Sequence, residues 1–214
     1  MTELDIEYIE QSITLGHVVS NALEVGTAED WCSLKPLLES KGIFTTGIDI
    51  KPGKYVDYIV DLEESSEKIK EKLKSHCPFQ SILCLNVLEH TFNPGIILDN
   101  LLGLLAPNGY LIISTPLVWP LHSYPFDFWR PLPNFYEQYA KRNELTLFSE
   151  RFKYLGFGLV SDYTSNFGSS GFPSPKTCKY RFLWGRLIHK VFNTFGQEYL
   201  FPNHLALALT YQRN

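Results

Sequence analysis

The sequence predicts an α/β protein whose core is a doubly wound, mostly parallel sheet. Two features carry this prediction: the apolar runs of residues 82–87 and 110–114, and the helical segment between them. Both runs are too unbroken for a strand with one wet face and are typical of buried parallel strands. A strand, a crossover helix and a second strand form a right-handed unit, whose ligands bind where the carboxyl ends of the strands open into loops.

The helix between these two strands has recognisable ends. Asn93 can cap it, Pro94 suits its first turn, and Pro107 stops it before a turn at Asn108-Gly109. Its body carries a wide apolar stripe that can pack on the sheet, formed by Ile97, Leu98, Leu101, Leu102 and Leu105.

Hydrophobic spacing and turn residues predict the elements of the first half. We expect strands over residues 21–26, 44–50 and 56–62. We expect helices over about residues 3–20, between Asp30 or Ser33 and Gly42, and over residues 63–76.

The second half is predicted to hold a helix over residues 132–142, a strand within residues 145–154 and a final strand over residues 204–211. Between the last two lies an insertion or cap region of about residues 160–200, with a loop at 166–177 rich in Gly and Pro. The apolar spacing of residues 179–195 predicts an amphipathic helix with a basic face. Because the protein is acidic overall, this helix suits the cover of the sheet or a homodimer interface better than a membrane surface.

Length and composition predict one domain over residues 1–214, since 214 residues that are 44% hydrophobic and 20% charged can build one large core. A formal charge of −4 disfavours nucleic acid as a partner. No apolar run approaches the ~18 residues of a membrane span, so we expect no membrane anchor and a cytoplasmic location. The four cysteines lie far apart and in no ligand spacing, which predicts reduced thiols and no metal site.

Two residues at predicted strand ends suggest a nucleotide-like ligand. Gly26 ends the first strand, where the backbone must turn sharply. Asp49 ends the second strand, and its carboxylate can accept both hydroxyls of a ribose. Asp49 could instead cap a turn with Pro52-Gly53. Asn86 lies at the end of the fourth strand and faces the same edge.

A longer stretch resembles a known family. The run LCLNVLEHTFNPGIILDNLLGLLAPNGYLIISTP, followed by HSYPFDFWRP, is similar to class I S-adenosylmethionine-dependent methyltransferases of the type 11 family. The shared signature is a strand that ends in a hydrophobic residue before Glu-His, a Pro-x-Gly turn, and a strand that runs into a proline. The resemblance covers about residues 21–131. It implies a Rossmann-like methyltransferase fold of seven strands with an antiparallel C-terminal strand.

The resemblance also implies a cofactor site. S-adenosylmethionine would bind, and S-adenosylhomocysteine would leave as product. Glu24 and Gly26 match the acidic-x-Gly start of the family's first motif, although Thr27-Ala28-Glu29 replaces its usual Gly-x-Gly continuation. An ordinary strand-to-helix turn is the alternative for this motif, and a helix cap is the alternative for Asp61. The implied cofactor-binding residues are Glu24, Gly26, Thr27, Asp49, Ile50, Asp61, Leu62, Asn86 and Leu88.

The segment after the fifth strand is the expected acceptor side of the site. Residues 117–130 are rich in aromatic and polar groups, which suits a pocket wall. His122 and Asp127 are the candidate proton acceptors, and Tyr124, Trp129 and Arg130 are the candidate substrate contacts. Asp127 and Arg130 could instead pair with each other and brace the loop. Glu89 and His90 are expected to shape the loop after the fourth strand.

These residues favour methyl transfer to a small-molecule acceptor with an oxygen or nitrogen nucleophile. The atypical first motif keeps a second hypothesis open, a catalytically silent protein of this fold that binds a ligand or partner. A nicotinamide-dependent oxidoreductase is less supported, because the chain lacks GxGxxG and a Tyr-x-x-x-Lys set.

Overall fold

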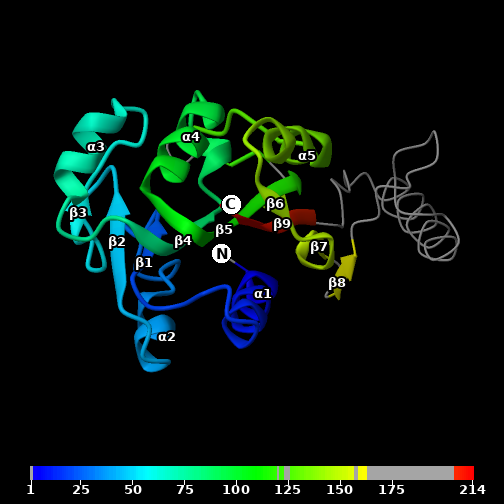
Figure 1. The fold of residues 1–214 in the computed structure, drawn as a ribbon. Helices are drawn as coiled ribbons and strands as arrows, with labels where there is room; N and C mark the ends of the chain where they lie inside the picture. Colours follow the sequence, from blue (N-terminus) through cyan, green and yellow to red (C-terminus); the bar gives the residue numbers. More distant parts are fainter. Residues whose placement is uncertain (1, 120, 123–125, 157–158, 163–204) are drawn as a thin grey trace, which may run out of the picture.

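The computed structural model describes residues 2–119, 121–122, 126–156, 159–162 and 205–214. These residues form one sheet of nine strands in the order β3-β2-β1-β4-β5-β9-β7-β8, with β6 also paired to β9 (Figure 1). The parallel strands are β1 (Ala22–Val25), β2 (Thr45–Asp49), β3 (Tyr58–Ile59), β4 (Phe79–Leu85) and β5 (Leu105–Val118). The antiparallel strands are β6 (Thr146–Leu147), β7 (Lys153–Gly156), β8 (Leu159–Asp162) and β9 (Leu205–Gln212).

The predicted doubly wound α/β class and its antiparallel C-terminal strand are confirmed. Within the described ranges the strand count is nine rather than seven, because residues 146–162 form three short strands instead of one. These three strands lie beyond β5, next to β9 or beyond it in the sheet.

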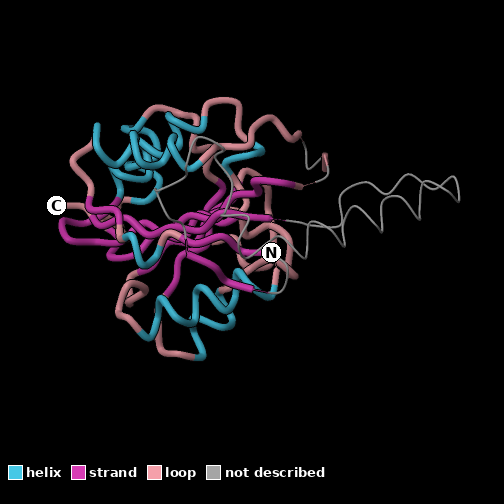
Figure 2. The backbone as a smooth tube through the Cα atoms, turned by 90° about the vertical axis from the view of Figure 1, so that its right-hand side faces the viewer, coloured by secondary structure: helices cyan, strands magenta, loops and turns pink. Residues whose placement is uncertain are grey.

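Helices cover both faces of the sheet (Figure 2). The helices on one side are α1 (Glu3–Thr14) and α2 (Lys35–Ser40), and those on the other are α3 (Ser66–Leu73), α4 (Pro94–Leu104) and α5 (Pro133–Arg142). Side chains of β4 and β5 alternate between the two cores: Leu83 and Ile112 pack with α1 and α2, whereas Ile82 and Leu111 pack with the other helices. Burial on both faces explains why these strands read as unbroken apolar runs.

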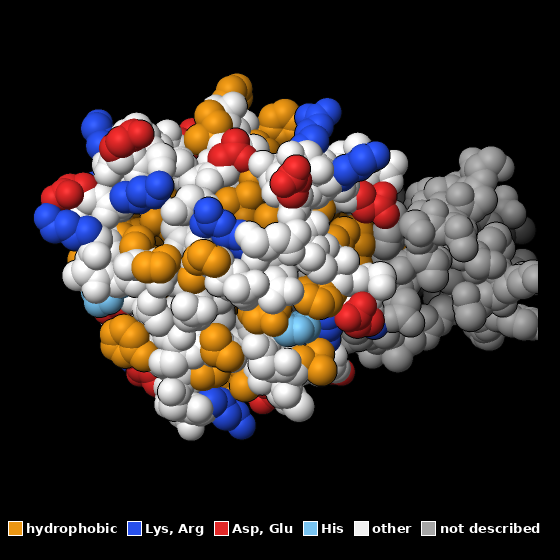
Figure 3. Space-filling view, in the orientation of Figure 1, with side chains coloured by type: hydrophobic (Ala, Val, Ile, Leu, Met, Phe, Trp, Pro, Cys, Tyr) orange, Lys and Arg blue, Asp and Glu red, His pale blue; other side chains and the backbone are white. Residues whose placement is uncertain are grey.

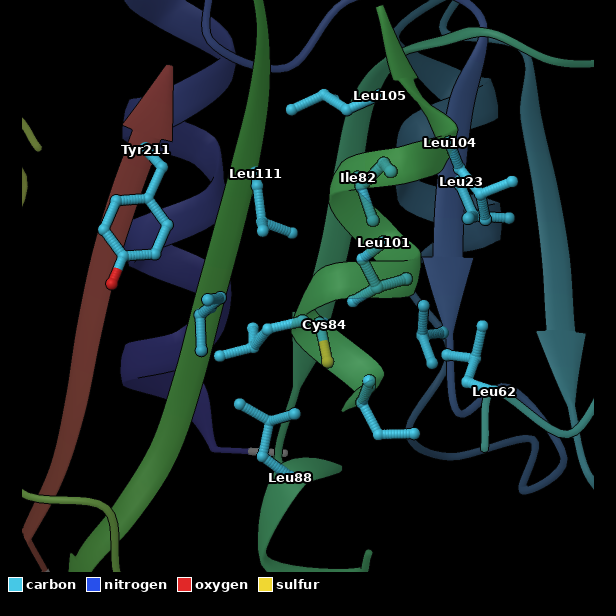
Figure 4. Packing of buried hydrophobic residues seen from close by; sticks show 14 of the residues in the cluster. Leu23, Leu62, Ile82, Cys84, Leu88, Leu101, Leu104, Leu105, Leu111 and Tyr211 are labelled. Atoms are coloured by element: carbon cyan, nitrogen blue, oxygen red, sulfur yellow. The ribbon is translucent and has the colours of Figure 1, made fainter. Parts of the chain in front are cut away.

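The apolar stripe of α4 forms the centre of the larger core. Figure 4 shows Leu101 and Leu104 of this helix over Ile82 and Cys84 of β4, and all four side chains are buried. Fully burying a leucine stabilises the folded chain by about 1.5–3 kcal/mol relative to exposure. This packing fixes α4 over β4 and therefore fixes the loop that joins them.

Several element ends differ from the predictions. The first helix was expected to run to about residue 20 but ends at Thr14. Two residues later, Gly16 takes a left-handed φ of 75°, which a helix cannot continue through. α2 begins after Leu34, so neither Asp30 nor Ser33 is its cap. α4 begins at Pro94 as predicted but ends at Leu104, before Pro107, because Leu105 already pairs with Phe79 of β4.

The start of α4 is held by a distant side chain. Asn93 is at the cap position but makes no capping hydrogen bond with its own side chain. Instead, the Glu63 carboxylate accepts the N–H groups of Phe92 and Asn93 at 2.8 and 3.1 Å. A carboxylate near a helix N-terminus is also favoured by the helix dipole.

Part of the chain falls outside the described residues. The predicted loop at 166–177, the amphipathic helix at 179–195 and with it the homodimer prediction all lie there, as does most of the expected insertion. The organisation as one domain over residues 1–214 stays a prediction. Within the described ranges, the helices are all too short or too polar to cross a bilayer.

Candidate active site

The carboxyl ends of β1, β2 and β4 open into a cavity of about 460 Å³. Its wall comes from five places on the chain: the ends of these strands, the loop after β1, the turn after β3, the loop before α4, and the segment after β5. Ligands of doubly wound sheets bind at this edge. The cavity therefore lies where the sequence predicted a site.

Gly26 occupies a position that only glycine fits. Its φ is 84°, and a Cβ added there would lie 2.7 Å from Cγ2 of Val87. Its N–H donates to the carbonyl of Ile48 at 2.9 Å, which turns the chain over the end of β2. The next residue, Thr27, is fully buried and its hydroxyl donates to the carbonyl of Tyr55 at 3.2 Å. Gly26 lines the cavity and Thr27 does not, so the geometry gives no support to a cofactor contact from the Thr27 side chain.

Asp49 lines the cavity at the end of β2 and is already tied to the backbone. One carboxylate oxygen accepts the N–H of Ala28 at 2.9 Å, and the other accepts the N–H of Lys51 at 3.0 Å. The bond to Lys51 closes a turn, so Asp49 also has the turn-capping role that was the alternative to ligand binding. Each carboxylate oxygen can accept a further hydrogen bond, which leaves Asp49 able to bind ligand hydroxyls. Its neighbour Ile50 also lines the cavity and is exposed.

Glu24 is buried at the end of β1 and connects this strand to α2. Its carboxylate accepts the N–H of Leu34 at 2.5 Å and the hydroxyl of Ser33 at 3.0 Å. Burial raises the pKa of Glu24 to about 7, and these hydrogen bonds only partly oppose that effect. Glu24 borders the cavity, and its hydrogen bonds position the loop that follows Gly26.

The turn after β3 supplies the next stretch of wall. Asp61 and Leu62 both line the cavity; Leu62 is buried, and Asp61 accepts the N–H of Glu63 at 2.8 Å. The helix-cap alternative for Asp61 is wrong, because α3 begins only at Ser66 with Ser65 at its cap position. The Asp61 carboxylate instead closes the turn after β3.

At the end of β4, Asn86 lines the cavity with a left-handed φ of 53°. Its side-chain amide donates to Asp5 of α1 at 3.3 Å, so the first helix reaches the edge of the site. Leu88, two residues on, is fully buried in the core beneath α4 and is not on the cavity wall (Figure 4). The expected cofactor contact of Leu88 is not supported, because the short helical turn at Leu88–His90 points this side chain inward.

On the acceptor side, His122 lines the cavity with a side chain that is 39% exposed. Its Nδ1 lies 3.0 Å from Oδ2 of Asp127. The ring approaches off the line of a hydrogen bond, so this contact is electrostatic. The same oxygen also accepts the backbone N–H of His122 at 3.1 Å. Phe128 adds an aromatic face to this side of the wall.

Asp127 and Arg130 pair with each other, as the alternative interpretation had it. Both guanidinium NH₂ groups of Arg130 bind the Asp127 carboxylate, one of them at 2.6 Å. Arg130 lowers the pKa of Asp127 to about 2, although burial opposes this effect. Trp129 donates its indole N–H to the carbonyl of Phe92 at 3.1 Å. Neither Trp129, Arg130 nor Asp127 lines the cavity, and Tyr124 lies outside the described residues.

One group on this side was not predicted as a site. Glu89, His90 and His122 bring one ligand atom each within 4.8 Å of one another. The rings of His90 and His122 meet edge to face, with centroids 4.9 Å apart. The Glu-His pair after a strand was the available signal, but His122 is far along the chain, and only the fold brings it to this pair.

Charged side chains of both signs are spread over the visible surface (Figure 3). On the face seen in Figure 3, described Lys and Arg side chains lie beside Asp and Glu rather than gathering in a patch.

The sheet order, with a cavity at the carboxyl ends around its first strand, defines a doubly wound α/β protein, a class whose members bind ligands at this edge. Residues 9–161, more than half of the chain, match the family described as "Methyltransferase domain". The chain belongs to this family. It therefore carries a methyltransferase domain and has the fold of S-adenosylmethionine-dependent methyltransferases, as the sequence predicted.

Solved structures agree on the fold. A SAM-dependent methyltransferase from Archaeoglobus fulgidus is 15% identical, with 99% of this chain and 95% of that chain covered and a TM-score of 0.54. A methyltransferase from Mesorhizobium loti is 12% identical, with 98% and 100% covered and a TM-score of 0.54. The 1,6-didemethyltoxoflavin-N1-methyltransferase of Burkholderia thailandensis, with bound 1,6-didemethyltoxoflavin and S-adenosylhomocysteine, is 10% identical, with 99% and 78% covered and a TM-score of 0.57. A search of curated proteins found no match.

Proposed function

We propose that this protein transfers the methyl group of S-adenosylmethionine to an oxygen or nitrogen atom of a small molecule. One observation carries the proposal: a single cavity is bounded on one side by the predicted donor residues Gly26, Asp49 and Asp61, and on the other by His122 and Phe128. Its volume of about 460 Å³ falls in the range of small-molecule sites. The Burkholderia thailandensis structure, which holds a small molecule beside S-adenosylhomocysteine, supports this acceptor class.

On the donor side, each residue is chemically complementary to one part of S-adenosylmethionine. The Asp49 carboxylate accepts the ribose hydroxyls with the lone pairs that the backbone leaves free. Gly26 lets the backbone pass close to the methionine portion, because it presents no side chain. Asp61 and Leu62 border the adenine, and Asn86 closes the wall between donor and acceptor.

The acceptor side positions the nucleophile. The sulfonium already makes the methyl group electrophilic, so the protein must align the acceptor with the sulfur–methyl bond and exclude water. Phe128 supplies apolar wall for this purpose. With Nδ1 beside the Asp127 carboxylate, Nε2 of His122 is the nitrogen left to receive the proton of a hydroxyl acceptor. Asp127, held by Arg130, positions the ring and is not itself the base.

A second candidate function has a specific observation behind it. Glu29 and Ala28 line the cavity where the family's glycine motif would continue, and the N–H of Ala28 is already bound by Asp49. A site altered in this way could bind a ligand without turnover. The oxidoreductase alternative has no such support, because the family match is to a methyltransferase domain. A cytoplasmic location stays a prediction.

Methyl transfer from labelled S-adenosylmethionine to a panel of small hydroxyl and amine compounds tests the proposal. We expect turnover with at least one compound, and a loss of about 10²-fold in turnover in His122→Ala with donor affinity retained. His76→Gln is the matched control, since His76 contacts the hydroxyl of Tyr58 away from the cavity. Donor binding without turnover on any compound would favour the silent binding protein.

A further inference from the structure

Glu89, His90 and His122 form a three-residue cluster on the acceptor side of the cavity. Their nearest ligand atoms all lie within 4.8 Å of one another. His90 and His122 are on the cavity wall, and Glu89 lies behind them with its side chain only 1% exposed. Two imidazoles and one carboxylate are a common ligand set for divalent first-row metals.

Each imidazole has an oxygen close to its Nδ1, and the ring of His90 is held as a metal-binding histidine usually is. Nδ1 of His90 lies 2.5 Å from the carbonyl oxygen of Phe126, which can only accept, so Nδ1 carries the proton. A histidine that ligates a metal typically directs its other nitrogen to a carbonyl or a carboxylate in this way, so His90 keeps Nε2 for a ligand. Nδ1 of His122 lies 3.0 Å from the Asp127 carboxylate, which Arg130 holds in place, although off the line of a hydrogen bond.

Glu89 is an independent sign that something is bound here. Among the described residues, neither of its carboxylate oxygens has a hydrogen-bond partner on another residue. Leaving a buried polar group without a partner costs about 1–3 kcal/mol, and more for a charged group. The nearest basic atom is Nε2 of His90, 3.7 Å from Oε1. A cation between these atoms would satisfy the carboxylate and use both free imidazole nitrogens.

We propose that Glu89, His90 and His122 bind a divalent transition-metal ion such as Zn²⁺ or Co²⁺. At ligand distances of about 2.0–2.2 Å the three atoms must close toward the ion by an ångström or so, for which the half-exposed His122 has room. The remaining coordination positions face the cavity, because His90 and His122 line it. Three protein ligands with an open position are the arrangement of a catalytic rather than a structural metal site.

The metal site also narrows the class of methyl acceptor, and this step rests on the proposed function. An acceptor hydroxyl bound to the ion loses its proton to solvent more readily, because the cation stabilises the resulting oxyanion. The oxygen then forms a bond to the methyl carbon, the sulfur–carbon bond breaks, and its electron pair stays on the sulfur of S-adenosylhomocysteine. With the ion bound, His122 is a ligand and the ion activates the acceptor in place of a free imidazole. Hydroxyl acceptors that chelate are thus favoured over amines.

Binding of Co²⁺ to the chelator-treated, untagged protein tests the site directly, by calorimetry and by the visible absorption of the bound ion. We expect one Co²⁺ per chain, displaced by Zn²⁺. Affinity should fall at least about tenfold in Glu89→Gln and in His122→Ala, and by about 10–100-fold in Asp127→Asn, which leaves all three ligands in place. His76→Gln should bind like the unchanged protein.

Each variant is also titrated with S-adenosylhomocysteine and checked by circular dichroism. Retained S-adenosylhomocysteine binding with no saturable Co²⁺ binding would overturn the metal site alone. Equal Co²⁺ affinity in the unchanged protein, Glu89→Gln and His122→Ala would overturn it as well, since the ion would then be bound elsewhere. Absence of S-adenosylhomocysteine binding in the unchanged protein would contradict the proposed function, whatever the Co²⁺ result.

Discussion

The two sides of the cavity are built in different ways. On the donor side, Glu24, Asp49 and Asp61 all accept backbone N–H groups, so the strands and turns that precede them fix their positions. On the acceptor side, His122, Asp127 and Arg130 position one another through their side chains, and Glu89 has no hydrogen-bond partner on another described residue. The fold itself therefore prepares the donor side, whereas the acceptor side depends on contacts among a few side chains.

This difference predicts how each side responds to mutation. Changes on the donor side should act through backbone geometry and alter donor binding. Changes on the acceptor side should alter turnover or metal affinity and leave donor binding in place.

The largest effect is expected at Gly26. A valine there would take an unfavourable positive φ and meet Cγ2 of Val87, so the loop must shift and S-adenosylhomocysteine binding should be lost. Calorimetry measures the binding, and thermal unfolding separates loss of the site from loss of the fold. Gly26→Ala is the milder companion. A folded Gly26→Val protein that binds S-adenosylhomocysteine normally would show that the backbone at Gly26 is not part of the donor site.

Glu24 should make stability depend on pH. Its pKa is about 7 when folded against 4.5 as the ordinary value, so the folded state holds the proton more tightly. The contribution of Glu24 to the free energy of unfolding is therefore largest below about pH 4.5 and is lost as the pH rises to about 7. At about 1.4 kcal/mol per pH unit, the loss is roughly 3 kcal/mol at most. Denaturant unfolding at several pH values measures this slope.

Glu24→Gln provides the comparison for that slope. Glutamine keeps the shape and can still accept the N–H of Leu34, but it does not titrate. Its unfolding free energy should lose the decline between about pH 4.5 and 7. The same decline in Glu24→Gln as in the unchanged protein would assign the pH dependence to other groups.

The smallest effect is expected at Glu29. Its carboxylate lines the cavity where the family has glycine, and Glu29→Gly removes a negative charge and loosens the loop. If the native loop weakens donor binding, S-adenosylhomocysteine affinity should rise a few-fold in calorimetry, roughly the size of an exposed charge contact. An increase would strengthen the silent-binding hypothesis, and unchanged or weaker binding would count against it.

The donor side was largely predictable from the sequence because its residues follow directly from strand ends. Gly26, Asp49, Asp61 and Asn86 all line the cavity, as expected. The misses concern side-chain direction. Thr27 turns toward Tyr55 and Leu88 toward the core, because local twists of the chain set which way each residue points.

The acceptor side was predictable only in outline. His122 lines the cavity, but the Asp127–Arg130 pair could not be separated from a substrate contact by sequence alone. Contacts between distant segments also escaped prediction. Glu63 caps α4 from the turn after β3, and Glu89 and His90 meet His122 only because β4 and β5 are neighbours. The expectation of no metal considered cysteine spacing and could not see this cluster.

The most direct test of the account is calorimetric titration of the unchanged protein and of Asp49→Ala with S-adenosylhomocysteine, with NAD as the competing ligand. We expect saturable S-adenosylhomocysteine binding, no NAD binding, and a loss of about tenfold to a hundredfold in affinity in Asp49→Ala, since a charged acceptor of hydrogen bonds is worth about 1.5–3 kcal/mol. Glu39→Ala, a change of an exposed carboxylate on α2, should bind normally. Binding of NAD in preference to S-adenosylhomocysteine, or unchanged affinity in Asp49→Ala, would contradict the assignment of this cavity to the methyl donor.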